Sequence, residues 1–336
     1  MNDKRNSDQL RVGRVIKAQS GFYTILTEGG DQVVARIRGR LKKERRDTTM
    51  VAVGDFVRWQ EVSDGTAMIE HVCERERALC RLRPLASGRH SRRWDRQGYL
   101  REREQVIIAN PDQVVFVIAC AQPDPRLRML DRLLVGAERQ RIPPIICANK
   151  VDLVGIDEAR KQFDIYTEIG YRVIYTSAET ERGVDELQTA LQDRISALVG
   201  PSGVGKTSLL NAIEPDLGKR VRSISQATGK GRHTTTVAEL VSLEVGGWVA
   251  DTPGIRALAF FDLEPEEIDA YFPDIAPYVP HCNFSDCSHR VEPGCAVLEA
   301  LDKGEIDEHR YESYVRLHQE HRKLADMYWW GIDEST

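Results

Sequence analysis

The chain has 336 residues and a formal net charge of −5, with 41% hydrophobic and 29% charged residues. This composition is typical of a soluble globular protein with two or three domains, and the absence of any run of about 18 uncharged apolar residues excludes a membrane span. Because residues 1–10 contain no apolar run, we expect no signal peptide, and we expect a cytosolic monomer with no membrane partner.

A small β-barrel is predicted for residues 11–73, after a disordered tail at residues 1–10. Glycine-bearing turns separate five short runs of strand character. The expected strands are Val12–Ala18, Phe22–Thr27, Gln32–Ile37, Phe56–Glu61 and Ala67–Val72. Five strands in about 60 residues favour an OB-fold barrel, although an SH3-like barrel would give nearly the same pattern.

Two arginine-rich stretches are candidates for RNA contact. The first, residues 36–46, has seven positive residues against one negative and joins two barrel strands, as either a solvated loop or a phosphate-contacting loop. The second lies in residues 74–104, which we interpret either as an interdomain linker or insert, or as an RNA-contacting segment that uses Trp94 and Tyr99 for base stacking. The residues predicted to contact RNA are Arg36, Arg38, Arg40, Lys42, Lys43, Arg92 and Arg93.

Residues 105–262 alternate between apolar runs of strand length and amphipathic helical segments. Strands are expected at 106–109, 113–119, 145–148 and 172–175, and helices at 127–140, 157–169 and 184–192. Alternation of this kind predicts an α/β domain with a parallel sheet that is covered on both faces.

A phosphate-binding loop follows the apolar run Ile195–Val199. The segment reads Gly-Pro-Ser-Gly-Val-Gly-Lys-Thr at 200–207 and leads into a helix. Its glycines allow backbone N–H groups to converge on phosphate oxygens, Lys206 supplies a mobile charge, and Thr207 can bind magnesium. The sequence therefore predicts a nucleotide site here.

Two further loops at strand ends predict that the base is guanine. Asn149-Lys-Val-Asp152 offers a carboxylate that can accept hydrogen bonds from N1–H and the 2-amino group together, which adenine cannot supply. The Lys150 stem would lie over the plane of the base, and a backbone N–H of Thr176-Ser-Ala178 can meet the guanine O6. Either motif alone is weak, but both at the ends of strands in one sheet strongly favour guanine.

Two segments after the phosphate loop are typical of nucleotide-sensing switches. The first contains Gly231-Arg-His-Thr-Thr-Thr236, and the second is Asp251-Thr-Pro-Gly254 after a predicted hairpin of 237–244 with 248–250. In a nucleotide hydrolase the aspartate holds the magnesium shell, and the glycine N–H meets the γ-phosphate. We expect triphosphate to order both loops and hydrolysis to release them.

The C-terminal residues 263–336 carry three cysteines and one histidine within 14 residues. Four soft ligands at this spacing, Cys282, Cys287, His289 and Cys295, predict one tetrahedral, structural zinc. Residues 306–328 should form a helix whose stripe of Tyr311, Tyr314, Val315, Leu317 and Leu324 packs in a core. A seven-cysteine chain with this cluster is better explained by free thiols and a metal than by disulfides.

The order of these motifs is rotated relative to most GTPases, because the guanine motifs precede the phosphate loop. With a barrel before it and a cysteine cluster after it, the chain closely resembles the RsgA (YjeQ) family of circularly permuted GTPases that depend on the small ribosomal subunit. The resemblance includes Val-Gly-Asp at 53–55 and Ala-Asn-Pro-Asp-Gln-Val at 109–114. It implies GTP hydrolysis stimulated by the small subunit and a late role in maturation of that subunit.

The resemblance also implies functional residues. His233 resembles the proposed catalytic histidine of the family, and the apolar Ile255 stands where Ras-like enzymes keep a water-orienting glutamine. The alternative is that His233 is a polar switch-loop residue or a ribosome contact. Either Thr234 or Thr235 closes on magnesium and the γ-phosphate, and we assign Thr235, with Thr207 and Asp251, to magnesium. The predicted nucleotide-binding residues are Asn149, Lys150, Asp152, Ser177, Ala178, Gly200, Ser202, Gly203, Val204, Gly205, Lys206, Thr207, Ser208, Thr234, Thr235, Asp251 and Gly254.

Two other functions have to be compared with this one. The chain could be an RNA-binding module in which the nucleotide is a structural ligand, or a permuted GTPase that acts on the large subunit or on tRNA. If it is the small-subunit GTPase, nucleotide state is expected to control its release. Because the chain passes from Gly254 almost directly into the zinc domain, a shift of the second switch would reorient that domain.

Overall fold

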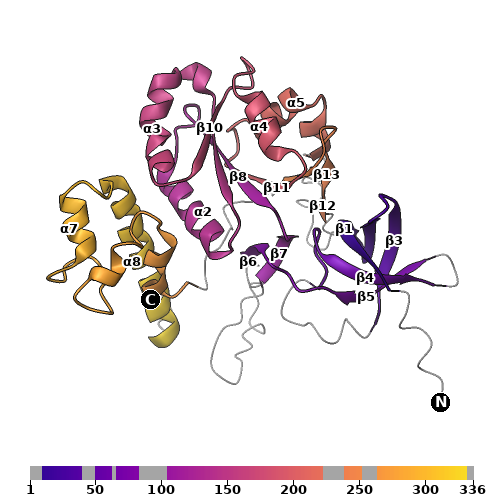
Figure 1. Cartoon of the computed structure of the whole chain (residues 1–336), viewed down its shortest axis with the longest axis horizontal. Helices are drawn as coiled ribbons and strands as arrows, with labels where there is room; N and C mark the ends of the chain where they lie inside the picture. Colours follow the sequence, from indigo (N-terminus) through magenta and orange to yellow (C-terminus); the bar gives the residue numbers. More distant parts are fainter. Residues whose placement is uncertain are drawn as a thin grey trace, which may run out of the picture.

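A computed structural model describes residues 10–39, 50–62, 66–82, 104–221, 238–251 and 263–330. The N-terminal barrel lies at one side of a central α/β domain, and the C-terminal helices lie at the other side, against α2 (Figure 1). Within the described residues, no helix combines the length and apolarity that a membrane-spanning segment needs.

The barrel contains the five predicted strands in OB-fold order. Each strand buries one face around the side chain of Trp59, which is fully buried. The sheet runs β1-β2-β3-β5-β4, β3 and β5 are parallel, and pairing of β1 with β4 closes the barrel, which distinguishes it from the SH3-like alternative. The strands are β1 (Arg11–Gln19), β2 (Phe22–Thr27), β3 (Gln32–Ile37), β4 (Phe56–Glu61) and β5 (Ala67–Val72).

The Val-Gly-Asp segment at 53–55 joins the barrel to the rest of the chain. Gly54 has φ +93°, and a Cβ atom on it would lie 1.9 Å from the Ala109 carbonyl oxygen, so only glycine allows this approach. The buried carboxylate of Asp55 accepts two hydrogen bonds from Arg75, at 2.7 Å each. Backbone contacts of Val53 with Ile108 and Ala109, and the ion pair of Asp55 with Arg75, therefore hold this barrel segment against the chain that leads from the barrel into the central domain.

A two-stranded ribbon precedes the central sheet. The apolar run at 106–109 was expected in the parallel sheet, but it forms β7 (Glu104–Ala109), which pairs antiparallel with β6 (Ala78–Leu82). The prediction was wrong because an apolar run does not identify its partner strand. The strand β6 lies within the segment interpreted as a linker or insert, where no strand is predicted from the sequence.

The central sheet has the order β10-β9-β8-β11-β14-β13, with all strands parallel except the edge strand β13. The residues of β8 alternate between two cores, because Val114, Phe116 and Ile118 face one side and Val115 and Val117 face the other. Helices α2 and α3 cover the first face, and α4 and α5 cover the second. The predicted covered parallel sheet is confirmed.

The bounds of these elements follow the sequence prediction closely. They are β8 (Gln113–Ala119), α2 (Leu127–Arg139), β9 (Pro144–Asn149), the 3-10 turn η1 (Val151–Leu153), α3 (Ile156–Glu168), β10 (Arg172–Thr176), α4 (Val184–Leu191), β11 (Ile195–Val199), α5 (Lys206–Ile213) and β14 (Trp248–Asp251). The phosphate-loop strand β11 follows β8, β9 and β10 in the chain, so the domain is circularly permuted as predicted.

The predicted hairpin strand at 237–244 divides between two sheets. Its first part, β12 (Ala238–Glu239), pairs antiparallel with β1 of the barrel, and its second part, β13 (Val241–Ser242), pairs with β14. Leu240 lies between them, and its amide donates to the Ile16 carbonyl at 2.9 Å. The predicted hairpin is therefore confirmed only for β13 and β14. The first part of the predicted strand pairs instead with the edge of the barrel at β1.

The C-terminal part packs on α2 through a long helix. This part contains the 3-10 turns η3 (Pro265–Tyr271) and η4 (Val279–His281) and the helices α7 (Ala296–Asp302) and α8 (Glu308–Trp330). Tyr314 and Leu317 of α8 are buried, and Tyr311 and Val315 pack beside them. The core role predicted for this stripe is confirmed for these four residues, whereas the Leu324 side chain lies outside the described part.

Candidate nucleotide and metal sites

The phosphate loop joins β11 to α5 and requires glycine at defined positions. A Cβ atom on Gly200 would lie 2.2 Å from the Val117 carbonyl oxygen in the neighbouring strand. Gly203 and Gly205 have φ of +84° and +97°, a region that side-chain-bearing residues rarely adopt. Lys206 begins α5, and its ammonium group donates to the carbonyl oxygens of Gly200 at 2.6 Å and Pro201 at 3.0 Å.

Asn149, at the end of β9, ties the two guanine loops to the phosphate loop. Its buried amide nitrogen donates to the Val204 carbonyl oxygen at 2.8 Å, and its amide oxygen accepts from the Thr176 hydroxyl at 3.1 Å. Three strand ends meet at this edge of the sheet. Asn149 therefore links both guanine loops to the phosphate loop through the two polar atoms of its side chain.

The remaining guanine-motif residues lie beside Asn149. Lys150 has φ +65°, and its ammonium group donates to the Gln122 carbonyl oxygen. Asp152 is exposed in η1, as a carboxylate that receives a base must be. Ser177 is buried, and its hydroxyl accepts from the Thr180 amide at 3.1 Å, which fixes the turn after β10.

The structure thus places the predicted residues of both guanine loops and the phosphate loop at the carboxyl ends of β9, β10 and β11. Val204 is buried, Ala178 and Thr207 are half-buried, and Ser202 and Ser208 are exposed. Asp251 ends β14 and pairs with Leu198 of β11, which brings its backbone beside the phosphate loop. Predicted residues outside the described part are His233, Thr234, Thr235, Gly254 and Ile255.

Of the predicted RNA-contacting residues, the described part contains Arg36 and Arg38. The Arg36 guanidinium lies 4.5 Å from the ring centroid of Phe22, and Arg38 pairs with Glu70 at 2.5 Å. Both lie on β3 or directly after it. The other predicted contacts lie outside the described residues: Arg40, Lys42, Lys43, Arg92 and Arg93.

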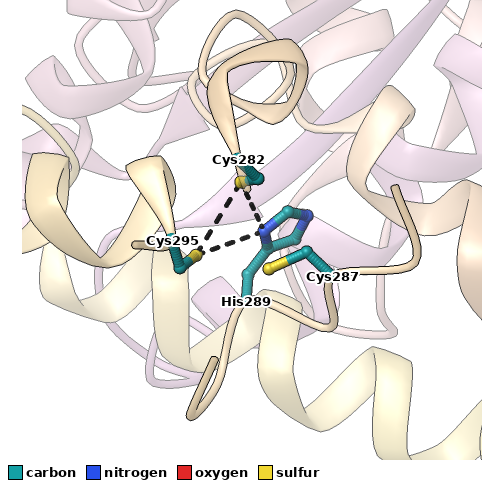
Figure 2. A group of neighbouring side chains, drawn as sticks. All are labelled: Cys282, Cys287, His289 and Cys295. Carbon is teal, nitrogen blue, oxygen red and sulfur yellow. Dashed lines mark hydrogen bonds between the residues drawn. The ribbon is translucent and has the colours of Figure 1, made fainter. Parts of the chain in front are cut away.

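The predicted metal ligands meet in one cluster (Figure 2). One ligand atom from each of Cys282, Cys287, His289 and Cys295 lies within 4.8 Å of all the others. The Nδ1 atom of His289 faces the sulfur atoms of Cys282 and Cys295, at 3.5 Å and 3.4 Å. Ligands from four points of the chain therefore converge on one position, which could hold a metal ion.

The surroundings of the cluster fit a cation. The Nε2 atom of His289 lies 3.1 Å from a carboxylate oxygen of Asp269, which leaves Nδ1 to face the metal position. Burial raises the pKa of the Cys282 thiol, but the backbone N–H groups of Ala296 and Val297 at the start of α7, together with His289 and Cys295, lower that pKa overall, whereas burial raises the pKa of the Cys287 and Cys295 thiols. A thiol of lowered pKa is readily deprotonated, as a metal ligand must be.

Glu292 orders the loop between two of these ligands. Its carboxylate accepts hydrogen bonds from the amides of Ser288, Arg290 and Val291, at 3.0 Å to 3.1 Å, and from the Ser288 hydroxyl. Sequence reasoning missed Glu292 and Asp269. The only available signal was a carboxylate three residues after His289, which is too common to interpret alone.

Comparison with known proteins agrees with this arrangement. A family model described as RsgA GTPase matches residues 93–261, and one described as RsgA N-terminal domain matches residues 12–69. Small ribosomal subunit biogenesis GTPase RsgA from Gemmatimonas aurantiaca is 41% identical over 311 residues, which are 92% of this chain and 97% of that protein. Its counterpart from Geobacillus kaustophilus is 40% identical over 95% of this chain and 100% of that protein.

Solved structures show the same fold. The crystal structure of YjeQ from Thermotoga maritima has a TM-score of 0.73 and 33% identity, and the match covers 93% of this chain and 99% of that one. YloQ, described as a circularly permuted GTPase, has a TM-score of 0.69 and 31% identity, and covers 96% of this chain and 99% of that one. The chain therefore belongs to the RsgA family of GTPases and is an enzyme that hydrolyses GTP.

Proposed function

We propose that this GTPase binds the small ribosomal subunit, hydrolyses GTP at a late step in the maturation of that subunit, and leaves after hydrolysis. The observation that carries the proposal is similarity over 90% or more of the chain to GTPases named for biogenesis of the small ribosomal subunit. The similarity includes the barrel and the C-terminal module as well as the GTPase domain. The monomeric state and cytosolic location expected from the sequence are part of the same proposal.

The outer face of the barrel supports an RNA partner. Phe22 on β2 is 42% exposed, and the guanidinium of Arg36 from β3 lies across its ring. An exposed aromatic ring beside a cation offers a base a stacking surface and a phosphate a counter-charge. We propose that these strands and the basic segment that follows β3 contact ribosomal RNA.

Sedimentation with purified ribosomal subunits tests the partner and the release. Because hydrolysis would end the bound state, we expect the protein to pellet with small subunits when a non-hydrolysable GTP analogue is present, and with about 10-fold lower affinity when GDP is present. Large subunits serve as the control and should retain none of the protein. Equal binding with the two nucleotides would contradict release, and preference for large subunits would contradict the partner.

The cofactors follow from the ligand sets. Guanine nucleotide is used with Mg²⁺ in this family, and we propose that the Thr207 hydroxyl and the Asp251 carboxylate supply oxygen ligands to it. For the cluster of three thiolates and one imidazole we propose a structural zinc, since these soft ligands form a closed tetrahedral set without a position for substrate. Zinc would fix the fold of the C-terminal module, while magnesium would neutralise charge on the phosphates.

Replacing Asp152 by asparagine should change base selectivity. Asparagine offers an amide donor where guanine also presents donors, so we expect GTP to bind at least about 100-fold more weakly, while xanthosine triphosphate, which has a carbonyl at C2, should bind more tightly than GTP. Nucleotide titration measures both affinities. Asp157→Asn, an exposed change in the first turn of α3, is the matched control. Unchanged GTP affinity in Asp152→Asn would remove Asp152 from the base site.

His233 is proposed to position the attacking water, because Ile255 offers no polar group for that role. We expect His233→Ala to lower subunit-stimulated turnover by about 100-fold and to leave GTP affinity unchanged. Single-turnover hydrolysis together with nucleotide titration separates the two effects. His281→Ala, an exposed histidine near the metal cluster, is the control. Full stimulated turnover in His233→Ala would assign the water to another residue.

A further inference from the structure

The loop that joins β8 to α2, residues 120–126, is hydrogen-bonded to the guanine motif and lies beside the phosphate loop. The Gln122 carbonyl oxygen accepts a hydrogen bond from the ammonium group of Lys150. Pro123 lies beside the phosphate loop: a Cβ atom added to Gly203 would be 3.8 Å from the Cδ atom of Pro123. The position of this loop therefore affects where the Lys150 stem and the edge of the phosphate loop lie.

Helix α2 follows this loop directly and is positioned by tertiary contacts. Among the residues that the structure describes, no side chain caps its N-terminus at Arg126, and its first turn has no acidic residue. Asp131 in the second turn is 1% exposed and accepts three hydrogen bonds. The donors are the Tyr166 hydroxyl at 2.9 Å, the Arg310 guanidinium at 2.7 Å and the Ser313 hydroxyl at 2.5 Å. Two of these donors belong to α8.

Arg310 is fully buried and joins two carboxylates. Besides Asp131, it contacts Asp274 through two hydrogen bonds, from Nε at 3.1 Å and from Nη2 at 2.8 Å. Its guanidinium lies 4.7 Å from the ring centroid of Phe272 and 5.9 Å from that of Tyr166. Buried charges are costly when they lose a partner, so this group strongly favours one placement of α2 against α8.

We propose that Arg310 is a positioning residue for guanine nucleotide binding. It contacts neither nucleotide motif itself, but through Asp131 it fixes α2, and with α2 the loop at 120–126, against Lys150 and the phosphate loop. The proposal rests on the assignment of Lys150 to the guanine base. It places a determinant of nucleotide affinity in the C-terminal module, outside the GTPase domain.

The same helix also reaches the metal cluster. The hydroxyl of Tyr311 donates to the His289 carbonyl oxygen at 2.8 Å, and the hydroxyl of Tyr314 donates to the Ser288 carbonyl oxygen at 3.1 Å. One turn of α8 therefore contacts the metal loop on one side and Asp131 on the other. This contact is made by α8 and does not involve the chain segment directly after Gly254, which lies outside the described residues. Reorientation of the module through that segment stays a hypothesis.

Steady-state kinetics of Arg310→Lys test the proposal. Lysine keeps the charge but loses the planar fork that bridges the two carboxylates. We expect the KM for GTP to rise about 5- to 10-fold and kcat to stay within about two-fold, because the loop contacts binding motifs rather than the attacking water. A merely structural defect would give the opposite pattern, since a partly unfolded sample has a lower apparent kcat and an unchanged KM.

Two further variants complete the test. Arg128→Ala removes the exposed ion pair with Glu312 at 3.2 Å, which joins the same two helices, and should leave KM unchanged. Ser313→Ala removes one hydrogen bond to Asp131 and should raise KM by a smaller factor, and it decides the question if Arg310→Lys fails to fold. Folded Arg310→Lys or Ser313→Ala protein with the wild-type KM for GTP would overturn the proposal. If the wild-type protein bound no guanine nucleotide, the assignment of the site would fail instead.

Discussion

Gly205→Ala is expected to abolish tight guanine nucleotide binding, with an affinity at least about 100-fold lower than that of the wild-type protein. The backbone of Gly205 has φ +97°, which is strained for alanine, and the new Cβ atom would lie 2.4 Å from the amide nitrogen of Asn149. Because that nitrogen donates to the Val204 carbonyl oxygen, the clash also breaks the link between the guanine motif and the phosphate loop. Titration with a fluorescent guanine nucleotide measures the loss.

Gly170→Ala is a close control for this experiment. Gly170 also has a positive φ, +101°, but a Cβ atom there would meet no heavy atom within 4 Å. The control therefore has the backbone strain without the clash, and we expect it to lower the stability by about 1 kcal/mol and to leave nucleotide affinity unchanged. If Gly205→Ala bound GTP as tightly as Gly170→Ala, the phosphate loop would not have the described conformation when nucleotide binds.

Cys282→Ser is expected to abolish binding of the proposed zinc and to unfold the C-terminal module locally. Serine is close to cysteine in size but is a poor ligand for a soft cation, so the site would lose one of four ligands. Binding of a structural zinc contributes on the order of 10 kcal/mol to the fold around it, and the Cys282 sulfur lies 3.9 Å from that of Cys295 and 3.5 Å from His289 Nδ1. Elemental analysis of the purified protein and amide hydrogen exchange of the module measure both effects.

Cys73→Ser and a chelator complete this experiment. Cys73 is half-buried and lies outside the cluster, so its replacement should retain one equivalent of zinc. Wild-type protein treated with a strong chelator should show the same increase in exchange as Cys282→Ser. Retention of zinc with unchanged exchange in Cys282→Ser would exclude Cys282 as a ligand. Stable protection after chelation would mean that the module folds without metal.

The sequence predicted the parts of the fold that have a local pattern. The five barrel strands each alternate around a buried face, and the central elements alternate between strand and helix, so their bounds were within a few residues of the structure. The strand β6 has Arg81 in its sequence and no periodic pattern, and β12 has two residues whose partner in β1 is about 220 residues away. Pairing with a distant strand leaves no local signal.

The candidate sites divide in the same way. The phosphate loop and the metal cluster could be predicted from the sequence because the spacing of their residues alone indicates the chemistry. Arg310 was missed because a charged residue near the start of a helix is usually solvated, and its partners Asp131 and Asp274 are far away in the sequence. One signal was available: Asp131 lies between Leu130 and Leu133, which are core residues of an amphipathic helix. A carboxylate on such a face requires a buried partner.

Measurement of GTP turnover with separated ribosomal subunits tests the proposed function most directly. The wild-type protein is assayed alone, with purified small subunits and with purified large subunits, at equal concentrations. We predict slow turnover by the protein alone, a large increase with small subunits, and no increase with large subunits. Stimulation by large subunits, or by neither, would contradict the assignment of the small subunit as the partner of this GTPase.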